Sequence, residues 1–237
     1  LVASWLRLHR NGKCVGIEGG CVACALQATR QSLPGNKKRL ALLEVLAAKP
    51  YANACSIGAF MRALVEDMVS AEPGGVPWPG IDLPRGCLAT QVDGLFAFVE
   101  ERRVRCCTCS TSRQEFRRDV VMELPIPEDT PDVASLTELY LQRCACRRVR
   151  ASCNSPKCGG VEREHDEQSR LLHLPAVLLV QLSRAGSSAP YPFAPEEHVS
   201  FANCGSAELV AVVYETKGAN GTRHPTCASR GPEGEFW

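Results

Sequence analysis

The sequence has few aromatic residues, almost no net charge and no long apolar run. Aromatic residues make up 6% of the 237 residues, and the formal net charge is +1. Because the charges nearly cancel, the whole-chain balance gives no reason to expect a polyanionic partner. No apolar run approaches the roughly 18 residues that a membrane-spanning helix requires, so we expect no membrane partner.

An export signal and an initiator Met are also missing. The first ten residues, Leu1 to Arg10, mix charged residues into apolar ones and do not resemble a signal peptide. Since the chain does not begin with Met, we expect it to be a piece of a longer protein. An apolar share of 45% and a charged share of 22% are typical of a globular protein. The length suits one large domain with lobes.

What the chain has in abundance is cysteine, with 14 residues. Secreted disulfide scaffolds are typically short, and this chain shows no export signal. We therefore expect reduced thiols and a cytoplasmic or nuclear setting. Two clusters stand out, Cys106 to Cys109 and Cys153 to Cys158, each followed by turn residues.

The spacing within these two clusters predicts a structural zinc ion. Two thiolates from each cluster can hold a tetrahedral ion and close the loop between them. The predicted ligands are Cys106, Cys109, Cys153 and Cys158. Three other cysteines remain without a role: Cys107, Cys144 and Cys146. The alternative interpretation is a set of scattered reduced thiols in a cysteine-rich chain.

Helical patterns dominate the first ninety residues and strand patterns the rest. Apolar spacing predicts helices over about Leu1–His9, Ala25–Ser32, Lys38–Ala48 and Ile57–Ser70, with a later short helix over Ser135–Leu141. The expected strands of an antiparallel sheet are Leu95–Val99, Val104–Cys106, Asp119–Ile126, Leu171–Leu174, Val177–Leu182 and Leu209–Tyr214. The Val177–Leu182 run is expected to be a buried central strand. The fold class is therefore α+β, a helical lobe followed by strands with a zinc-bound insertion.

The order of these pieces resembles the ubiquitin-specific protease family. The segment Leu172–Arg184 resembles the family's leucine-proline strand motif ending in Arg, which follows its second zinc pair. Glu208–Tyr214, then Gly221–Arg230 and Gly234–Trp237, resemble the family's Gly-His-Tyr box and closing Trp. Phe60–Val65 and Ser135–Leu141 resemble two of its helices. The resemblance covers roughly Cys21 to Trp237.

The resemblance implies a papain-like cysteine protease fold shaped as a right hand. Its parts would be a helical thumb in 1–90, zinc-ribbon fingers in 95–170 and an antiparallel-sheet palm in 171–237. The implied activity is a thiol protease acting as a deubiquitinase in the ubiquitin conjugation pathway, a hydrolase that cleaves after the ubiquitin C-terminus. Ubiquitin or a ubiquitin-like modifier and ubiquitinated proteins would then be the partners. His224 matches the catalytic His of the Gly-His-Tyr box.

Several positions depart from the family pattern. Arg223 stands where the family has Gly, and Pro225 where it has Tyr. The segment Asn11 to Cys14 resembles the turn that carries the family's nucleophilic Cys, but the residues of Val15–Gly20 do not readily form the helix that follows it in the family. We therefore expect the nucleophilic Cys to precede Leu1, with Cys14 as a second candidate, and this chain by itself to lack hydrolase activity. The third catalytic group is not identified.

Three functions compete on this sequence. The first is a deubiquitinase domain, and the second a catalytically inactive member that binds ubiquitin. The third is a zinc-ribbon nucleic-acid binder, suggested by two clusters of arginines, Arg102, Arg103 and Arg105, and Arg143, Arg147, Arg148 and Arg150. Because no aromatic residues are interleaved with these arginines, we do not expect nucleic acid to be a partner.

Overall fold

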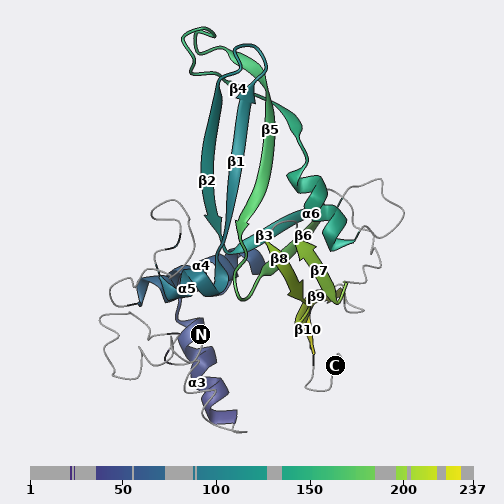
Figure 1. Ribbon diagram of the computed structural model, residues 1–237. Helices are drawn as coiled ribbons and strands as arrows, with labels where there is room; N and C mark the ends of the chain where they lie inside the picture. The colour runs from purple at the N-terminus through teal and green to yellow at the C-terminus, as the bar shows by residue number, and fades with distance from the viewer. Residues whose placement is uncertain are drawn as a thin grey trace.

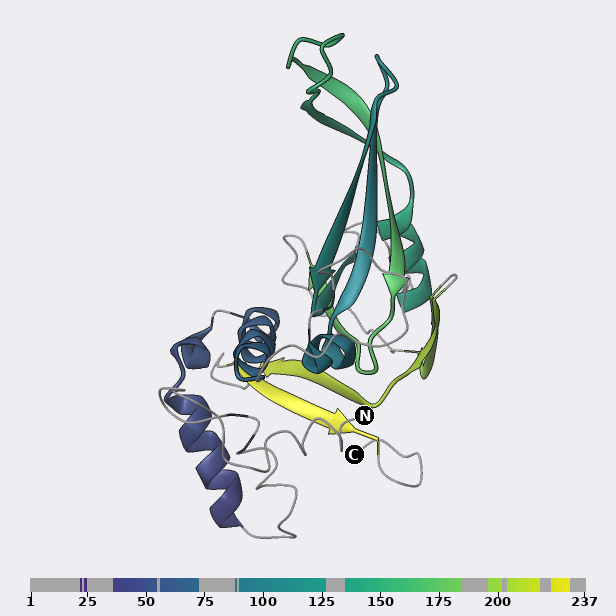
Figure 2. The ribbon, with the colours of Figure 1, turned by 60° about the vertical axis from the view of Figure 1, so that its left-hand side comes forward.

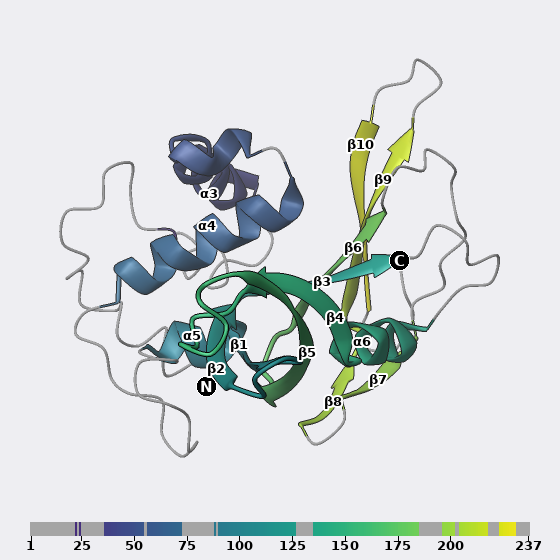
Figure 3. The same ribbon diagram turned by 90° about the horizontal axis from the view of Figure 1, so that it is seen from above.

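A computed structural model describes residues 22, 24, 36–54, 56–72, 88, 90–126, 135–184, 196–201, 204–217 and 223–230. A long, narrow sheet projects away from a base made of helices on one side and short strands on the other (Figure 1). Seen along the sheet, α3 and α4 lie opposite β9 and β10 (Figure 3). The predicted helices over Leu1–His9 and Ala25–Ser32 lie outside the described residues, as does Cys14.

The helical lobe agrees closely with its apolar pattern. It comprises α3 (Asn36–Ala47), a short 3-10 turn η2 (Pro50–Asn53) and α4 (Ile57–Ser70). The predicted bounds of α4 are confirmed, and the Ser56 hydroxyl accepts a hydrogen bond from the Ala59 N–H at its start. Val65 and Met68 of α4 are buried, as the helical spacing predicts. Gly58 allows a close approach, since a Cβ there would lie 1.9 Å from Oε1 of Gln181.

A strand predicted over Leu95–Val99 is wrong at its start, because the end of a helix occupies that position. This helix, α5 (Gln91–Phe96), begins with a capping box in which Thr90 and Asp93 bond each other's backbone N–H groups. The Glu72 carboxylate also accepts the N–H groups of Gln91 and Val92. The first turn therefore has its free donors satisfied and carries negative charge, which stabilises the helix over the strand.

Four antiparallel strands form the projecting sheet, which we call the finger sheet. They are β1 (Phe98–Cys106), β2 (Ser112–Asp119), β4 (Arg147–Ser152) and β5 (Glu162–His173), in the order β2-β1-β5-β4. The sequence pattern identified only the ends of β1 and β5 and missed β2 and β4. Their alternate residues are mostly charged, so they show no apolar period.

Short strand pairs form the rest of the base. β3 (Val121–Ile126) pairs with β6 (Leu179–Arg184), β7 (His198–Phe201) with β8 (Gly205–Glu208), and β9 (Ala211–Lys217) with β10 (Arg223–Ser229). The predicted antiparallel pairing is wrong for β3–β6, which is parallel, and the intervening α6, β4 and β5 supply the crossover connection that a parallel pair needs. The expectation of a buried central strand is also wrong among the described residues, since Val177 and Val180 are 39% and 37% exposed.

One further helix, α6 (Leu136–Cys144), packs on a second apolar core, which includes Phe98, Met122, Leu124 and Leu171. The short helix predicted over Ser135–Leu141 is confirmed, and the Ser135 hydroxyl caps its start by accepting a hydrogen bond from the Glu138 N–H. Tyr140 of α6 packs edge-on against Phe201, with ring centres 5.0 Å apart. None of the described helices is long and apolar enough to cross a membrane.

Two arginines fasten the finger sheet to the helices at its base. Arg62 of α4 bonds both carboxylate oxygens of Asp119, the Glu123 carboxylate and the Val121 carbonyl. Arg118 of β2 pairs with Glu66 of α4 and with Asp93 of α5, whose side chain is only 3% exposed. Figure 2 shows α5 lying directly under this end of the sheet, with α4 beside α5. The finger sheet and the helical lobe are therefore joined by charge pairs as well as by apolar packing.

Candidate metal centre

Four cysteine sulfurs converge at the far end of the finger sheet. Cys106 ends β1, Cys109 lies in the turn to β2, and Cys153 and Cys158 lie in the turn between β4 and β5. The four sulfurs all lie within 4.8 Å of one another. Cys106 Sγ is 3.9 Å from Cys158 Sγ, and Cys109 Sγ is 3.6 Å from Cys153 Sγ. Tetrahedral Zn–S bonds of about 2.3 Å require sulfur separations of about 3.8 Å.

The two turns that carry these cysteines are fixed by their own backbone hydrogen bonds. In the first, the Ser110 N–H donates to the Cys106 carbonyl at 2.9 Å, and Ser110 adopts a left-handed φ of 57°. In the second, the Cys158 N–H donates to the Ser155 carbonyl at 2.9 Å. Gly159 follows with a φ of 64°, which suits a residue without Cβ. Each turn therefore presents two sulfurs to one point.

The four thiols differ in how readily they lose their protons. Hydrogen bonds from the Thr111 hydroxyl and backbone N–H lower the pKa of Cys109 to about 5. Burial and the neighbouring thiols raise the pKa of Cys158 to about 12. A divalent cation held by these sulfurs would displace the remaining thiol protons, so its binding would depend on pH.

These residues fit a structural zinc ion. Cys106, Cys153 and Cys158 are each at most 5% exposed, and Cys109 packs against them. Burying four thiols at such separations is favourable when a soft divalent cation links them as thiolates. With all four positions filled by sulfur, a bound zinc ion would keep no open position for substrate.

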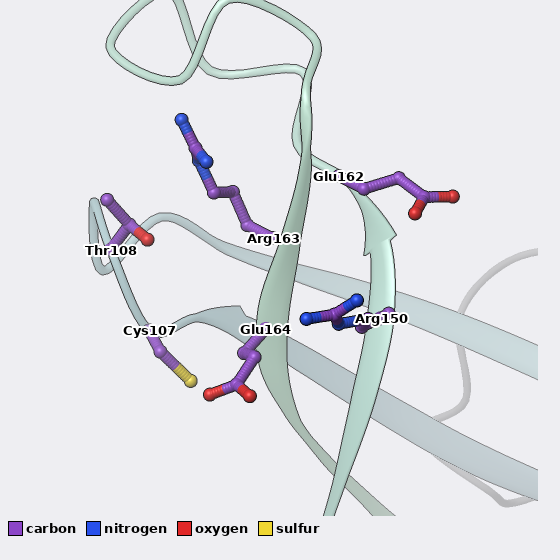
Figure 4. Close-up of a pocket in the computed structure, with 6 residues that line it drawn as sticks. All are labelled: Cys107, Thr108, Arg150, Glu162, Arg163 and Glu164. Atoms are coloured by element: carbon purple, nitrogen blue, oxygen red, sulfur yellow. The ribbon is translucent and has the colours of Figure 1, made fainter.

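The three cysteines to which the sequence assigned no role, Cys107, Cys144 and Cys146, are not part of this cluster. Cys107 and Cys146 are exposed, and Cys144 is half-buried on α6. Cys107 lines an open polar concavity of about 360 Å³ near the tip, together with Thr108, Arg150, Glu162, Arg163 and Glu164. In Figure 4 the Arg150 guanidinium and the Glu164 carboxylate lie on the same side of the sheet as the Cys107 thiol.

His224, the predicted catalytic residue, lies far along the chain on β10. Its backbone pairs with Thr216 of β9, and Pro225 pairs with Glu215. Within the described part of the chain β10 pairs with β9 alone, so Pro225 occupies an edge strand, where its missing N–H is tolerated. The structure brings the four cysteines together but does not test the role of His224 or of Cys14.

Sequence reasoning missed a set of buried carboxylates in the finger sheet. Glu101 is fully buried and accepts hydrogen bonds from Arg103, Arg170 and Gln114. Glu167 is 2% exposed and is held by Arg102 and Arg147. Two guanidiniums lower the pKa of each carboxyl although burial opposes them. Charges that read as a solvated surface in the sequence therefore tie neighbouring strands together.

Comparisons with known proteins identify a fold but no family. Neither known family models nor curated proteins match the sequence. Solved structures with a similar fold include the SAGA module of Ubp8, Sgf11, Sus1 and Sgf73, a DUB module bound to ubiquitin aldehyde. That match has a TM-score of 0.69 and 16% identity, and covers 99% of this chain and 57% of the other.

Two further structures of this SAGA module give similar matches. A module with a Ubp8 variant bound to monoubiquitin matches with a TM-score of 0.69 and 18% identity, over 99% of this chain and 57% of the other. A module with a second Ubp8 variant and a shortened Sgf11 matches with a TM-score of 0.63 and 16% identity. The chain thus spans little more than half the length of the chains it matches. It has the α+β fold of the Ubp8 ubiquitin protease, with a cluster of four cysteines at the tip of its finger sheet.

Proposed function

We propose that this chain forms part of a deubiquitinase domain and binds ubiquitin between its finger sheet and its palm strands. The observation that supports this most is the fold similarity over 99% of the chain to Ubp8 modules bound to ubiquitin or ubiquitin aldehyde. The division into thumb (1–90), fingers (95–170) and palm (171–237) is part of the same proposal. It assigns α4 to the thumb, the finger sheet to the fingers and β9–β10 to the palm.

In this proposal the four cysteines hold a structural zinc ion. Cys106 and Cys109 sit at one tip turn, and Cys153 and Cys158 at the other. Linking these turns joins the β1–β2 hairpin to the β4–β5 hairpin at the end farthest from the apolar cores. The ion would therefore fix the curvature of the surface that holds ubiquitin.

His224 is the proposed general base and acid. A thiol protease needs a His that takes the proton of the nucleophilic Cys and then delivers it to the leaving amine. The β9–β10 ladder holds the backbone of His224 in an extended strand on the palm. The nucleophile remains open between Cys14 and a Cys outside this sequence.

A catalytically inactive ubiquitin binder is the second candidate, and the sequence around His224 favours it. Arg223 and Pro225 replace the residues on either side of the family's catalytic His. Pro225 removes one backbone donor and restricts His224, the residue before it, to extended conformations. Both changes alter the backbone that would aim the imidazole.

A ubiquitin-based thiol-reactive probe tests whether this chain carries the nucleophile. The test uses the zinc-loaded chain, the Cys14→Ala and His224→Ala variants, and Cys227→Ala as a matched control on the same strand as His224. Labelling that both Cys14→Ala and His224→Ala abolish, and Cys227→Ala leaves intact, supports an enzyme with Cys14 as nucleophile. Ubiquitin binding without labelling rules out Cys14 as the nucleophile and leaves the inactive binder and an enzyme whose nucleophile lies outside this sequence. Failure to bind ubiquitin contradicts both.

A further inference from the structure

One face of the finger sheet gathers arginines from three strands. On β1, β2 and β5, Glu101 lies opposite Phe116 and Arg170, and in the next row of the same face Arg103 lies opposite Gln114 and Gln168. Directly opposed and alternate residues of a sheet point to the same side. These side chains therefore share one face.

The same face continues toward the tip through β4. Arg105 lies opposite Asp166, which lies opposite Arg148, and Arg150 lies opposite Glu164. We call the surface formed by Arg103, Arg105, Arg148, Arg150, Arg170 and Phe116 the arginine face. Arginines of both sequence clusters thus lie on one face, and Phe116 lies on the same face in the row of Glu101, two rows from Arg105.

Two arginines of this face, Arg103 and Arg170, bind a buried carboxylate while most of each arginine side chain stays exposed. Glu101 is fully buried, whereas the side chains of Arg103 and Arg170, which it binds, are 58% and 60% exposed. One carboxylate thus accompanies two exposed cations. An arginine also carries five donors, so guanidinium N–H groups remain for a ligand.

Two arginines of the face stand outside its ion pairs. Arg105 and Arg150 are exposed and form no ion pair with the described part of the chain. The exposed carboxylates Glu164 and Asp166 lie 3.4 and 3.7 Å from nitrogens of Arg148. A single Arg148 guanidinium faces both carboxylates, and Glu162 lies on the same face opposite Ser152, so the five arginines of the face exceed its four carboxylates by one charge.

Phe116 distinguishes this face from an ordinary charged surface. Its side chain is among the large apolar groups left exposed, at 38%, and it lies beside the Arg103–Glu101–Arg170 group. The amides of Gln114 and Gln168 are exposed in the adjacent row. Arginines for phosphates, an open ring for stacking and amides for base edges are what sheet-based binders of single strands use.

We propose that the arginine face binds single-stranded nucleic acid, with the arginines on phosphates and a base stacked on Phe116. This function goes beyond ubiquitin binding and does not depend on it. A single strand fits better than a duplex, because a ring on a sheet can stack only on a base that is already unpaired. Charge attraction supplies most of the affinity, so binding weakens steeply with salt.

The test measures fluorescence anisotropy of labelled oligothymidylate at several salt concentrations, with the zinc-loaded chain. If five arginines contact phosphates, the slope of log K against log salt is about −3.5, and Arg105→Gln and Arg150→Gln each reduce its magnitude by about 0.7. Phe116→Ala is expected to weaken binding roughly 5- to 100-fold. Arg117→Gln is the matched control, since Arg117 lies opposite Glu100 on the other face of the sheet and its side chain is 60% exposed.

Competition distinguishes the ligand class. We expect unlabelled oligothymidylate to displace the probe and polyglutamate or a duplex of equal length to displace it poorly. Equal displacement by polyglutamate, together with unchanged binding in Phe116→Ala, would show a general anion surface and overturn the proposal. Preference for the duplex, no binding at low salt, or equal losses in Arg117→Gln and Arg105→Gln would overturn it as well. Far-ultraviolet circular dichroism confirms that each variant is folded.

Discussion

Replacing Glu101 by Gln tests whether buried carboxylates hold the finger sheet together. The side chain is fully buried and receives hydrogen bonds from Arg103 at 2.5 Å, from Arg170 and from Gln114. Glu101→Gln keeps the volume but removes the charge and directs an NH₂ group at donors. Hydrogen bonds to charged groups contribute about 1.5–3 kcal/mol each. Because both arginines are largely exposed and can rehydrate, we expect a total loss of about 2–3 kcal/mol at pH 7.

Urea unfolding followed by circular dichroism measures this loss, and pH gives it a signature. The two guanidiniums lower the pKa of Glu101 below that of the unfolded chain. The stabilisation is therefore complete above the unfolded value of about 4.3 and disappears as pH falls through the lower folded value. The difference between wild type and Glu101→Gln should be constant from pH 7 to about 5 and shrink below about 4.

Glu115→Gln is the matched control for this prediction. Glu115 also pairs with arginines, but its side chain is 36% exposed, and exposed ion pairs contribute about 0–1 kcal/mol. If Glu101→Gln is no more destabilising than Glu115→Gln, the buried carboxylate does not stabilise the sheet as argued. A difference that persists unchanged at acid pH would also contradict the electrostatic explanation.

Three further predictions concern the metal centre, the base of the fingers and a buried histidine. Cys158→Ser should lose stoichiometric zinc, measured by atomic absorption, and expose the finger sheet to limited proteolysis, whereas Cys107→Ser should retain both; equal zinc content in the two variants would contradict the ligand assignment. Arg118→Met should lower the free energy of unfolding by about 3 kcal/mol, because it removes a partner of the buried Asp93 carboxylate. The control Arg117→Met should lower it by under about 0.5 kcal/mol, and similar values for the two variants would refute the role of Arg118. Burial lowers the pKa of His173, so the stability that the neutral imidazole contributes is present above the unfolded pKa of about 6.5 and is lost as pH falls through the folded pKa. The unfolding temperature should therefore fall less between pH 7.5 and 5.5 in His173→Gln than in wild type, and equal falls in the two proteins would contradict this.

The sequence predicted the elements that are defined by apolar spacing or by local turns, and it failed for the elements that are stabilised by polar contacts between distant residues. The pattern of Phe60 to Met68 defined α4 because one face of that helix is core. The spacing of Cys106, Cys109, Cys153 and Cys158 predicted a cluster, which depends on two local turns and one strand register. By contrast, α5 replaced an expected strand because Thr90, Asp93 and Glu72 satisfy its first turn, and Glu72 is distant in sequence.

The finger strands could not be predicted because their stabilising partners lie on other strands. Glu101 next to Arg102 and Arg103 reads as a solvated charge run, yet its partners Gln114 and Arg170 come from β2 and β5. The same long-range pairing places Phe116 beside arginines that have no aromatic neighbour in the sequence. The roles of Cys14 and His224 stay predictions.

Isothermal titration with ubiquitin tests the central claim most directly. The zinc-loaded chain should bind ubiquitin saturably at one site per chain, and chelation of the metal should weaken this binding, because the tip of the finger sheet then loses its link between the two turns. No saturable heat up to about 1 mM ubiquitin would contradict the proposed ubiquitin site.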